Sequence, residues 1–145
     1  MTNALSRGAA AGAVATAAMS ALMLAAGRTG RMGRQPPEAI VRRAGAVTAG
    51  EPRGRLAEGL AVVAHLAFGV GTGAAYALLP RSRRPVLRGL AVGELVYAVS
   101  YAGWVPALGA LPQPRRDRTT RQVVMVAAHA VYGTVLGVLD DRWRR

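Results

Sequence analysis

The hydrophobic residues of this chain form four long blocks instead of the period-3.6 stripes that are typical of a water-soluble helical domain. The blocks cover residues 8–27, 59–79, 89–111 and 122–139, and arginine-rich segments separate them. About 20 apolar residues make a helix of about 30 Å, which matches the hydrocarbon thickness of a bilayer. The pattern therefore predicts an all-α integral membrane four-helix bundle, in a single domain over residues 1–145.

The first block has two interpretations. Residues 8–27 carry no charge and follow Arg7, so they could be the hydrophobic region of a cleaved signal peptide. However, the block is longer than a usual signal region, and its opening R-G-x-x-x-G at Arg7 recurs at Arg88. A cleaved segment has no reason to share a packing motif with a retained one, so we favour a retained helix.

The connector over residues 28–57 contains a further short helix. Pro36, Pro37 and Glu38 are typical of a helix start, with proline in the first turn and an acid near the positive end of the helix dipole. Apolar residues then follow at helical spacing, at Ile40, Val41, Ala44 and Val47, with Arg42 and Arg43 on the other side. The pattern predicts an amphipathic helix over about residues 37–47, either lying on the headgroups or solvated in an ordinary loop.

The third and fourth blocks carry their own signals. Pro106 predicts a kink near the end of the third, which a membrane helix tolerates when neighbouring groups satisfy the freed carbonyl. The fourth block is the shortest, about 27 Å by rise per residue, so we expect it to stand nearly upright. Asp140 and Asp141 are expected to end it.

The charge of the chain lies in the connectors. The 19 basic residues are all arginine and outnumber seven acidic residues, for a formal net charge of +12. They neither line one helix face nor alternate with aromatics, which disfavours nucleic acid and favours anionic lipid headgroups as the partner. The clusters are Arg28, Arg31 and Arg34; Arg81, Arg83 and Arg84; Arg115, Arg116 and Arg118; and Arg142, Arg144 and Arg145. The absence of cysteine excludes disulfides and thiolate metal sites.

Two motifs repeat along the chain. R-G-x-x-x-G opens the first and third blocks, and H-x-x-(Phe/Tyr)-G-x-x-x-G lies in the second and fourth. The pattern predicts two related helical hairpins that enter the membrane from the same side, as a parallel internal repeat. Glycines four apart let helix backbones approach closely, within one chain or in a homodimer. The expected packing glycines are Gly8, Gly12, Gly69, Gly73, Gly89, Gly93, Gly133 and Gly137.

Three ionisable side chains fall inside the blocks, namely His65, Glu94 and His129. Such residues are candidates for function because burying them in lipid is costly. Counted from the block ends, both histidines lie about 10 Å below the same membrane face, and about 12 Å separates them from Glu94. A direct contact between Glu94 and either histidine is therefore not expected.

Other polar residues are expected beside these three. Ser20, Ser100 and Tyr101 fall at the depth of the histidines. Thr16 and Tyr76 fall near Glu94, which Arg84 or Arg88 could also reach by extending inward. Two faces are expected to look into the bundle: His65, Gly69, Thr72 and Tyr76 on the second helix, and His129, Gly133, Leu136 and Asp140 on the fourth.

Three functions are compatible with these residues. The sequence contains no nucleophile–base pair, metal-ligand cluster or phosphate-binding loop, so an enzyme is disfavoured and neither catalytic residues nor a metal or cofactor are expected. The favoured interpretation is a structural or accessory membrane protein whose histidines form interhelical hydrogen bonds. A small proton-coupled transporter that uses His65, His129 and Glu94 is the alternative, and a haem held by the two histidines is a third.

Several of these segments together resemble a known group of proteins. They are the glycine pair followed by methionine in the first block, Pro36-Pro37-Glu38, His65-x-x-Phe-Gly, Gly103-Trp104-Val105-Pro106 and His129-x-x-Tyr-Gly-x-x-x-Gly. This arrangement resembles the YagU-like group of small bacterial inner-membrane proteins, over almost the whole chain. The resemblance implies four spans in a bacterial cytoplasmic membrane and no assigned activity.

Overall fold

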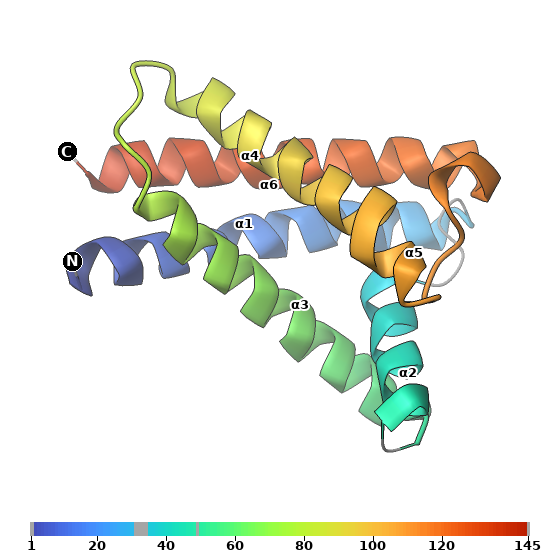
Figure 1. Ribbon diagram of the computed structural model, residues 1–145. Helices are drawn as coiled ribbons and strands as arrows, with labels where there is room; N and C mark the ends of the chain where they lie inside the picture. The colour runs from blue at the N-terminus through green and yellow to red at the C-terminus, as the bar shows by residue number, and fades with distance from the viewer. Residues whose placement is uncertain (1, 31–34, 49, 145) are drawn as a thin grey trace.

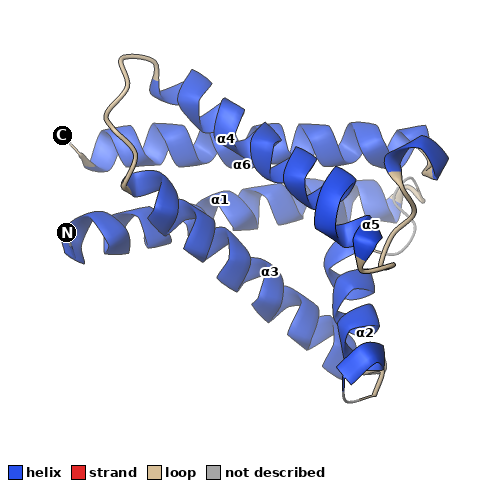
Figure 2. Cartoon of the chain, viewed as in Figure 1, coloured by secondary structure: helices blue, strands red, loops and turns tan. Residues whose placement is uncertain are grey.

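The computed structural model describes residues 2–30, 35–48 and 50–144, and over these residues the protein consists of helices joined by loops and turns (Figures 1 and 2). The helices are α1 (Thr2–Arg28), α2 (Pro36–Thr48), α3 (Gly54–Ala77), α4 (Pro85–Val99), α5 (Val105–Ala107) and α6 (Thr119–Trp143), with a π-helical turn η1 (Ser100–Trp104) and a 3-10 turn η2 (Pro114–Arg116). The prediction of an all-helical chain is confirmed over these residues. Arg31, Arg34 and Arg145, expected at the headgroups, lie outside them.

Three helices are long and apolar enough to cross a membrane: α1 from Asn3 onward, α3 and α6. The helix expected over residues 89–111 instead begins at Pro85 and is divided into α4, η1 and α5, which follow one another without a break to Ala107. The prediction that the last helix ends at Asp140 is wrong, because α6 continues to Trp143 and is 25 residues long. It is therefore longer than the short helix that the sequence predicts.

The helices pack in consecutive layers. The antiparallel helices α1 and α6 lie side by side, α3 packs against α1, and α4 packs against α6 (Figure 1). The start of α1, the end of α6 and the loop between α3 and α4 lie at one end of the molecule, and α2 and α5 lie at the other. Toward α2, the helix α3 diverges from α1.

Glycines form the contact between α1 and α3. A Cβ atom placed on Gly12 would lie against the carbonyl oxygen of Gly69 and 3.1 Å from the Cα of Gly73. A Cβ on Gly73 would lie only 2.7 Å from the Cα of Gly12, so the two backbones touch. We call this contact the α1–α3 seam, formed by Gly8, Gly12, Gly69 and Gly73.

A second glycine contact joins α4 to α6. A Cβ on Gly89 would lie 2.9 Å from the Cα of Gly137, and one on Gly93 would lie 3.0 Å from the Cα of Gly133. We call this contact the α4–α6 seam, formed by Gly89, Gly93, Gly133 and Gly137. At both seams a side chain larger than hydrogen would force the helices apart.

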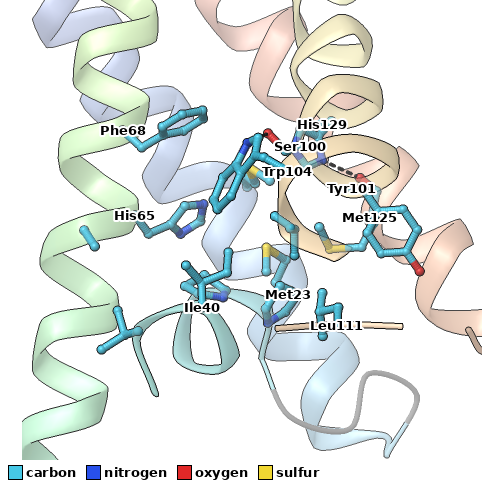
Figure 3. A pocket seen from close by; sticks show the side chains of 16 residues that line it. Met23, Ile40, His65, Phe68, Ser100, Tyr101, Trp104, Leu111, Met125 and His129 are labelled. Atoms are coloured by element: carbon cyan, nitrogen blue, oxygen red, sulfur yellow. Dashed lines mark hydrogen bonds between the residues drawn. The ribbon is translucent and has the colours of Figure 1, made fainter. Parts of the chain in front are cut away.

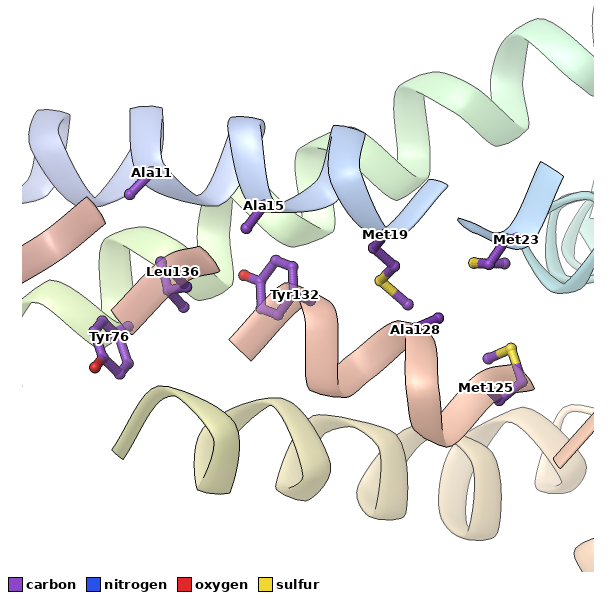
Figure 4. Close-up of a cluster of buried hydrophobic side chains, with 9 residues drawn as sticks. All are labelled: Ala11, Ala15, Met19, Met23, Tyr76, Met125, Ala128, Tyr132 and Leu136. Carbon is purple, nitrogen blue, oxygen red and sulfur yellow. The ribbon is translucent and has the colours of Figure 1, made fainter. Parts of the chain in front are cut away.

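The core lies between α1 and α6. Small residues at Ala11 and Ala15 face Leu136 and Tyr132, whereas the methionines of both helices fill the end nearer α2 (Figure 4). The buried hydroxyl of Tyr132 donates a hydrogen bond of 2.8 Å to the carbonyl oxygen of Gly69 on α3. This bond ties α6 to α3, although the two helices belong to different glycine seams.

The π-helical turn η1 directly precedes Pro106. Proline has no amide hydrogen and its ring clashes with the carbonyl four residues earlier in a regular helix. The wider turn over Ser100–Trp104 relieves that clash, and the amide of Val105 donates to the carbonyl of Ser100. Sequence analysis expects a disturbance at Pro106, and the structure locates it one turn earlier along the helix.

Helix α2 lies across one end of the molecule and packs against α3 (Figure 1). Its Arg42 donates to Glu38 at 2.8 Å and to Glu51 at 3.3 Å. The hydrogen bond to Glu38 is the main cause that raises the pKa of Arg42 above its ordinary value. Arg43 donates at 2.9 Å to the carbonyl of Leu108, so α2 is also fastened to the segment that follows α5.

Candidate functional site

A cavity of about 280 Å³ lies between α3 and the π-helical turn, and α2 closes one end of it (Figure 3). It is lined by both histidines of the apolar blocks, His65 and His129, together with Ser100 and Tyr101. We call it the histidine cavity. The rest of its lining is Met19, Met23, Pro36, Pro37, Ile40, Val41, Ala64, Phe68, Trp104, Val105, Leu111 and Met125.

His129 is buried and its tautomer follows from its hydrogen bond. Its Nδ1 atom lies 2.8 Å from the carbonyl oxygen of Met125. A carbonyl only accepts, so Nδ1 carries the proton and Nε2 of the neutral ring is an acceptor. Among the described residues, no partner is found for Nε2. The ring also packs against Tyr97, with centroids 5.4 Å apart.

His65 faces the cavity from the opposite helix. Its Nδ1 atom lies 3.4 Å from the hydroxyl oxygen of Ser20 on α1. Sequence analysis expects Ser20 at the depth of this histidine, and the structure places the two side chains together. The face His65, Gly69, Thr72 and Tyr76 is buried only at Gly69 and Tyr76, whereas its counterpart on α6 is buried at all four positions.

Ser100 and Tyr101 belong to the π-helical turn. The hydroxyl of Ser100 accepts a hydrogen bond of 3.2 Å from the indole nitrogen of Trp104, which leaves its own proton available to the cavity. Tyr101 donates its hydroxyl proton to Asp117, which also pairs with Arg121 at 3.0 Å. Tyr101 therefore directs its ring to the cavity and its hydroxyl to Asp117 in the segment before α6.

Glu94 lies closer to the level of His129 than the sequence predicts. A Cβ on the preceding Gly93 would touch the carbonyl oxygen of His129, so the backbones of Glu94 and His129 are almost level instead of about 12 Å apart. The prediction fails because α4 begins four residues and α6 three residues earlier than expected, which places both side chains near mid-helix. The carboxylate is half-buried and does not line the histidine cavity.

A second cavity, of about 560 Å³, lies on the other side of His65 between α1, α2 and α3. It is lined by two carboxylates, Glu38 and Glu58, and by the hydroxyl-bearing residues Thr16 and Ser20. The single imidazole of His65 borders both cavities. Glu58 is not among the residues predicted from the sequence, because it lies between the arginine-rich connector and the second hydrophobic block.

A buried ionic cluster lies at the opposite end of the molecule. The carboxylate of Asp140, only 1% exposed, accepts hydrogen bonds from Arg88 at 3.0 Å and from Arg144 at 2.7 Å. Arg88 also donates to the Tyr76 hydroxyl at 2.9 Å, and its guanidinium lies 4.4 Å above that ring. Arg144 donates at 2.5 Å to the carbonyl of Ala77. The cluster therefore fastens α4 and α6 to the end of α3.

This cluster corrects two expectations. The sequence predicts that Arg88 could reach inward to Glu94, but its guanidinium pairs with Asp140 on the neighbouring helix. Tyr76 was expected beside Glu94, but it is fully buried under Arg88. The i, i+4 spacing of Asp140 and Arg144 is the sequence signal that would have identified the pair.

The fold and these sites define a class: a helical protein with three helices of membrane-spanning length and a histidine-lined cavity between its helices. No protein-family model matches the chain, and no curated protein or solved structure is significantly similar to it. The described residues contain no group of three or more histidine, cysteine or acidic side chains that could hold a metal ion.

Proposed function

We propose that the chain is an integral membrane protein whose four spans are α1, α3, the continuous unit of α4, η1 and α5, and α6. Three of these helices have the required length and hydropathy. The fourth unit runs from Pro85 to Ala107, and its exposed side chains include the apolar Leu87, Leu95 and Val99. A bacterial cytoplasmic membrane, as in the YagU-like group, is part of the same proposal, with the connector arginines on anionic headgroups.

We further propose that the four spans are two related hairpins. Each hairpin has its own glycine seam, and in both seams the R-G-x-x-x-G glycines oppose those that follow the histidine. The α4–α6 seam has slid by one turn, because Gly89 approaches Gly133 whereas its counterpart Gly8 approaches Gly73. The motif alignment pairs Ser100 with Met19 and Phe68 with Tyr132.

For its activity, we propose an accessory role in which the protein binds a membrane component without transforming it. The observation that carries this proposal is the composition of the histidine cavity, which combines two imidazoles and a hydroxyl with an otherwise apolar lining. Such a lining, with few polar groups to orient a ligand, is typical of binding sites for small apolar molecules.

The test compares wild-type protein with His65→Ala and His129→Ala variants in proteoliposomes. We expect no proton flux from the wild type, and a lower thermal stability in both variants because each loses a hydrogen bond made by its imidazole. A wild-type flux that either substitution abolishes would overturn the accessory role. A Soret band in protein purified with added haem would instead assign the histidines to haem.

Proton-coupled transport is the second candidate, and one observation favours it. His65 separates the cavity that contains Glu38 and Glu58 from the histidine cavity, so a proton could pass from a carboxylate through an imidazole. If this function holds, Glu58→Gln should abolish proton flux. Glu94→Gln should leave it unchanged because Glu94 lines neither cavity.

A further inference from the structure

The histidine cavity lies between α3 and the unit that begins with α4, where these two helices do not pack closely. In the repeat proposed above, the contact of α1 with α6 has a counterpart between α4 and α3. In the closed contact, Met19 and Met23 of α1 and Tyr132 of α6 are buried in one cluster. Their counterparts Ser100, Trp104 and Phe68 all line the cavity. Phe68 and Trp104 are exposed whereas their counterparts Tyr132 and Met23 are buried, so this contact is open.

The opening has an apolar rim. Phe68 and Trp104 come from the two helices on either side of it and are 49% and 41% exposed. Both lie within segments that we propose to cross the bilayer, so the rim faces lipid chains. The occupant therefore comes from the membrane and is mainly apolar.

The size of the cavity restricts the occupant further. A volume of about 280 Å³ is slightly smaller than the usual range for small-molecule sites. A single hydrocarbon chain matches this volume better than a two-chain phospholipid or a haem does.

The polar groups define the head of that occupant. His129 presents Nε2 as an acceptor, since its Nδ1–H donates a hydrogen bond to the carbonyl oxygen of Met125. Ser100 has a proton to donate, since its oxygen accepts from Trp104. A hydroxyl group both donates and accepts, so it satisfies the two together. None of the described residues that line the cavity is an arginine, so a carboxylate or phosphate head would be buried without a counter-charge.

We propose that the histidine cavity binds a single-chain lipid alcohol, whose hydroxyl donates to His129 Nε2 and accepts from Ser100, with its chain along Phe68 and Trp104. The proposal rests on the membrane location proposed above. A neutral head with no donor, such as an ether, would leave the acceptor of His129 unsatisfied, so the cavity should discriminate between the two.

The test uses the fluorescence of Trp104, which becomes the single tryptophan in a Trp143→Phe background. The protein is placed in nanodiscs of unbrominated phospholipid and titrated with dibromo-octadecanol, whose bromines quench fluorescence at contact. We expect saturable quenching by the alcohol. The matched methyl ether should need about five-fold more ligand for half-quenching, as expected for the loss of one hydrogen bond.

Two variants keep the test decisive. His129→Ala should weaken binding of the alcohol until half-quenching needs as much alcohol as ether. Circular dichroism of this variant should show that the helices persist. Ala64→Phe introduces a bulky side chain on the cavity wall at an exposed position outside both glycine seams, and should abolish saturation. Saturable quenching that survives Ala64→Phe would overturn the proposal.

Three other outcomes have distinct meanings. Equal, non-saturating quenching by alcohol and ether would assign the opening to ordinary boundary lipid and overturn the proposal. If the quenching of Trp104 decreases as the protein concentration rises, the opening is covered by a second copy of the chain, and the proposal is overturned. If dibrominated phospholipid replaces the bilayer and fails to quench Trp104, the membrane location fails, and with it the proposed function.

Discussion

Gly12 and Gly93 lie in different seams but in the same physical situation, since each opposes a bare backbone on the next helix. Gly71, by contrast, lies on α3 with open space where its Cβ would be. The three residues therefore offer a direct comparison of seam glycines with an ordinary helical glycine.

We expect Gly12→Ala and Gly93→Ala each to lower the free energy of unfolding by about 1–3 kcal/mol, because a methyl group must push two backbones apart. Gly71→Ala should be neutral or slightly stabilising, since alanine favours the helix. Unfolding in detergent, followed by circular dichroism, measures all three. Equal stability of the seam variants and the Gly71 control would show that the seams are not close-packed.

Asp140 has the strongest ionic environment that the structure describes. We expect Asp140→Asn to destabilise the protein by about 3–5 kcal/mol, because it leaves the guanidinium groups of Arg88 and Arg144 partly buried without their shared carboxylate. Asp141→Asn on the same helix is the control. Its ion pair with Arg81 spans 3.8 Å and the Arg81 side chain is 59% exposed, so the loss of this pair should by itself cost no more than about 1 kcal/mol. A loss as large in the control as in Asp140→Asn would contradict the role of the cluster.

At the level of single residues, the sequence identifies those polar side chains that interrupt a hydrophobic block. His65, His129 and Glu94 are recognisable because charge is rare inside apolar blocks. Asp140 is also predicted, on the inward face of the last helix, but its arginine partners are not, because charge is ordinary in the connectors and at the end of the chain. The cluster depends on α6 extending to Trp143 and on Arg88 reaching across from α4, and neither is encoded in hydropathy.

Between elements, the hydroxyl of Tyr132 is the clearest bond from one proposed hairpin to the other. We expect Tyr132→Phe to reduce the free energy of unfolding by about 0.6–1.7 kcal/mol, the range measured for hydrogen bonds between membrane helices. Phe68→Tyr is the complementary change, because it adds a hydroxyl at the corresponding position of α3. If Tyr132→Phe unfolds at the same temperature as the wild type, the bond to Gly69 contributes nothing to the hairpin contact.

The elements themselves were predicted in kind but not in extent. Apolar blocks identify helices, yet helical geometry continues into flanking charged residues, as at Arg88 in α4 and Arg142 in α6. The same extension moved Glu94 to the level of His129. The π-helical turn before Pro106 could not be predicted, because proline in a helix is accommodated by a kink, a break or a wider turn, and neighbouring packing selects among them.

For the whole molecule, the proposal of four spans has a topological consequence. The C-terminus and the loop containing Ser82 should lie on one side of the membrane, and residues near Gly50 and Gln113 on the other. Fusions to a reporter that is active on only one side would measure this at each position. A protein with only the three longest helices inserted would instead give opposite signals at Ser82 and the C-terminus.

Finally, the opening bordered by Phe68 and Trp104 determines which ligand concentration governs the occupancy of the cavity. A site that is entered sideways from the bilayer responds to the number of ligand molecules per lipid, and the volume of surrounding water is irrelevant once the ligand has partitioned. Titrations at different lipid-to-protein ratios should therefore coincide when plotted against mole fraction in the bilayer. A weak interaction on this scale still gives high occupancy, because the membrane concentrates apolar molecules into two dimensions before the protein meets them.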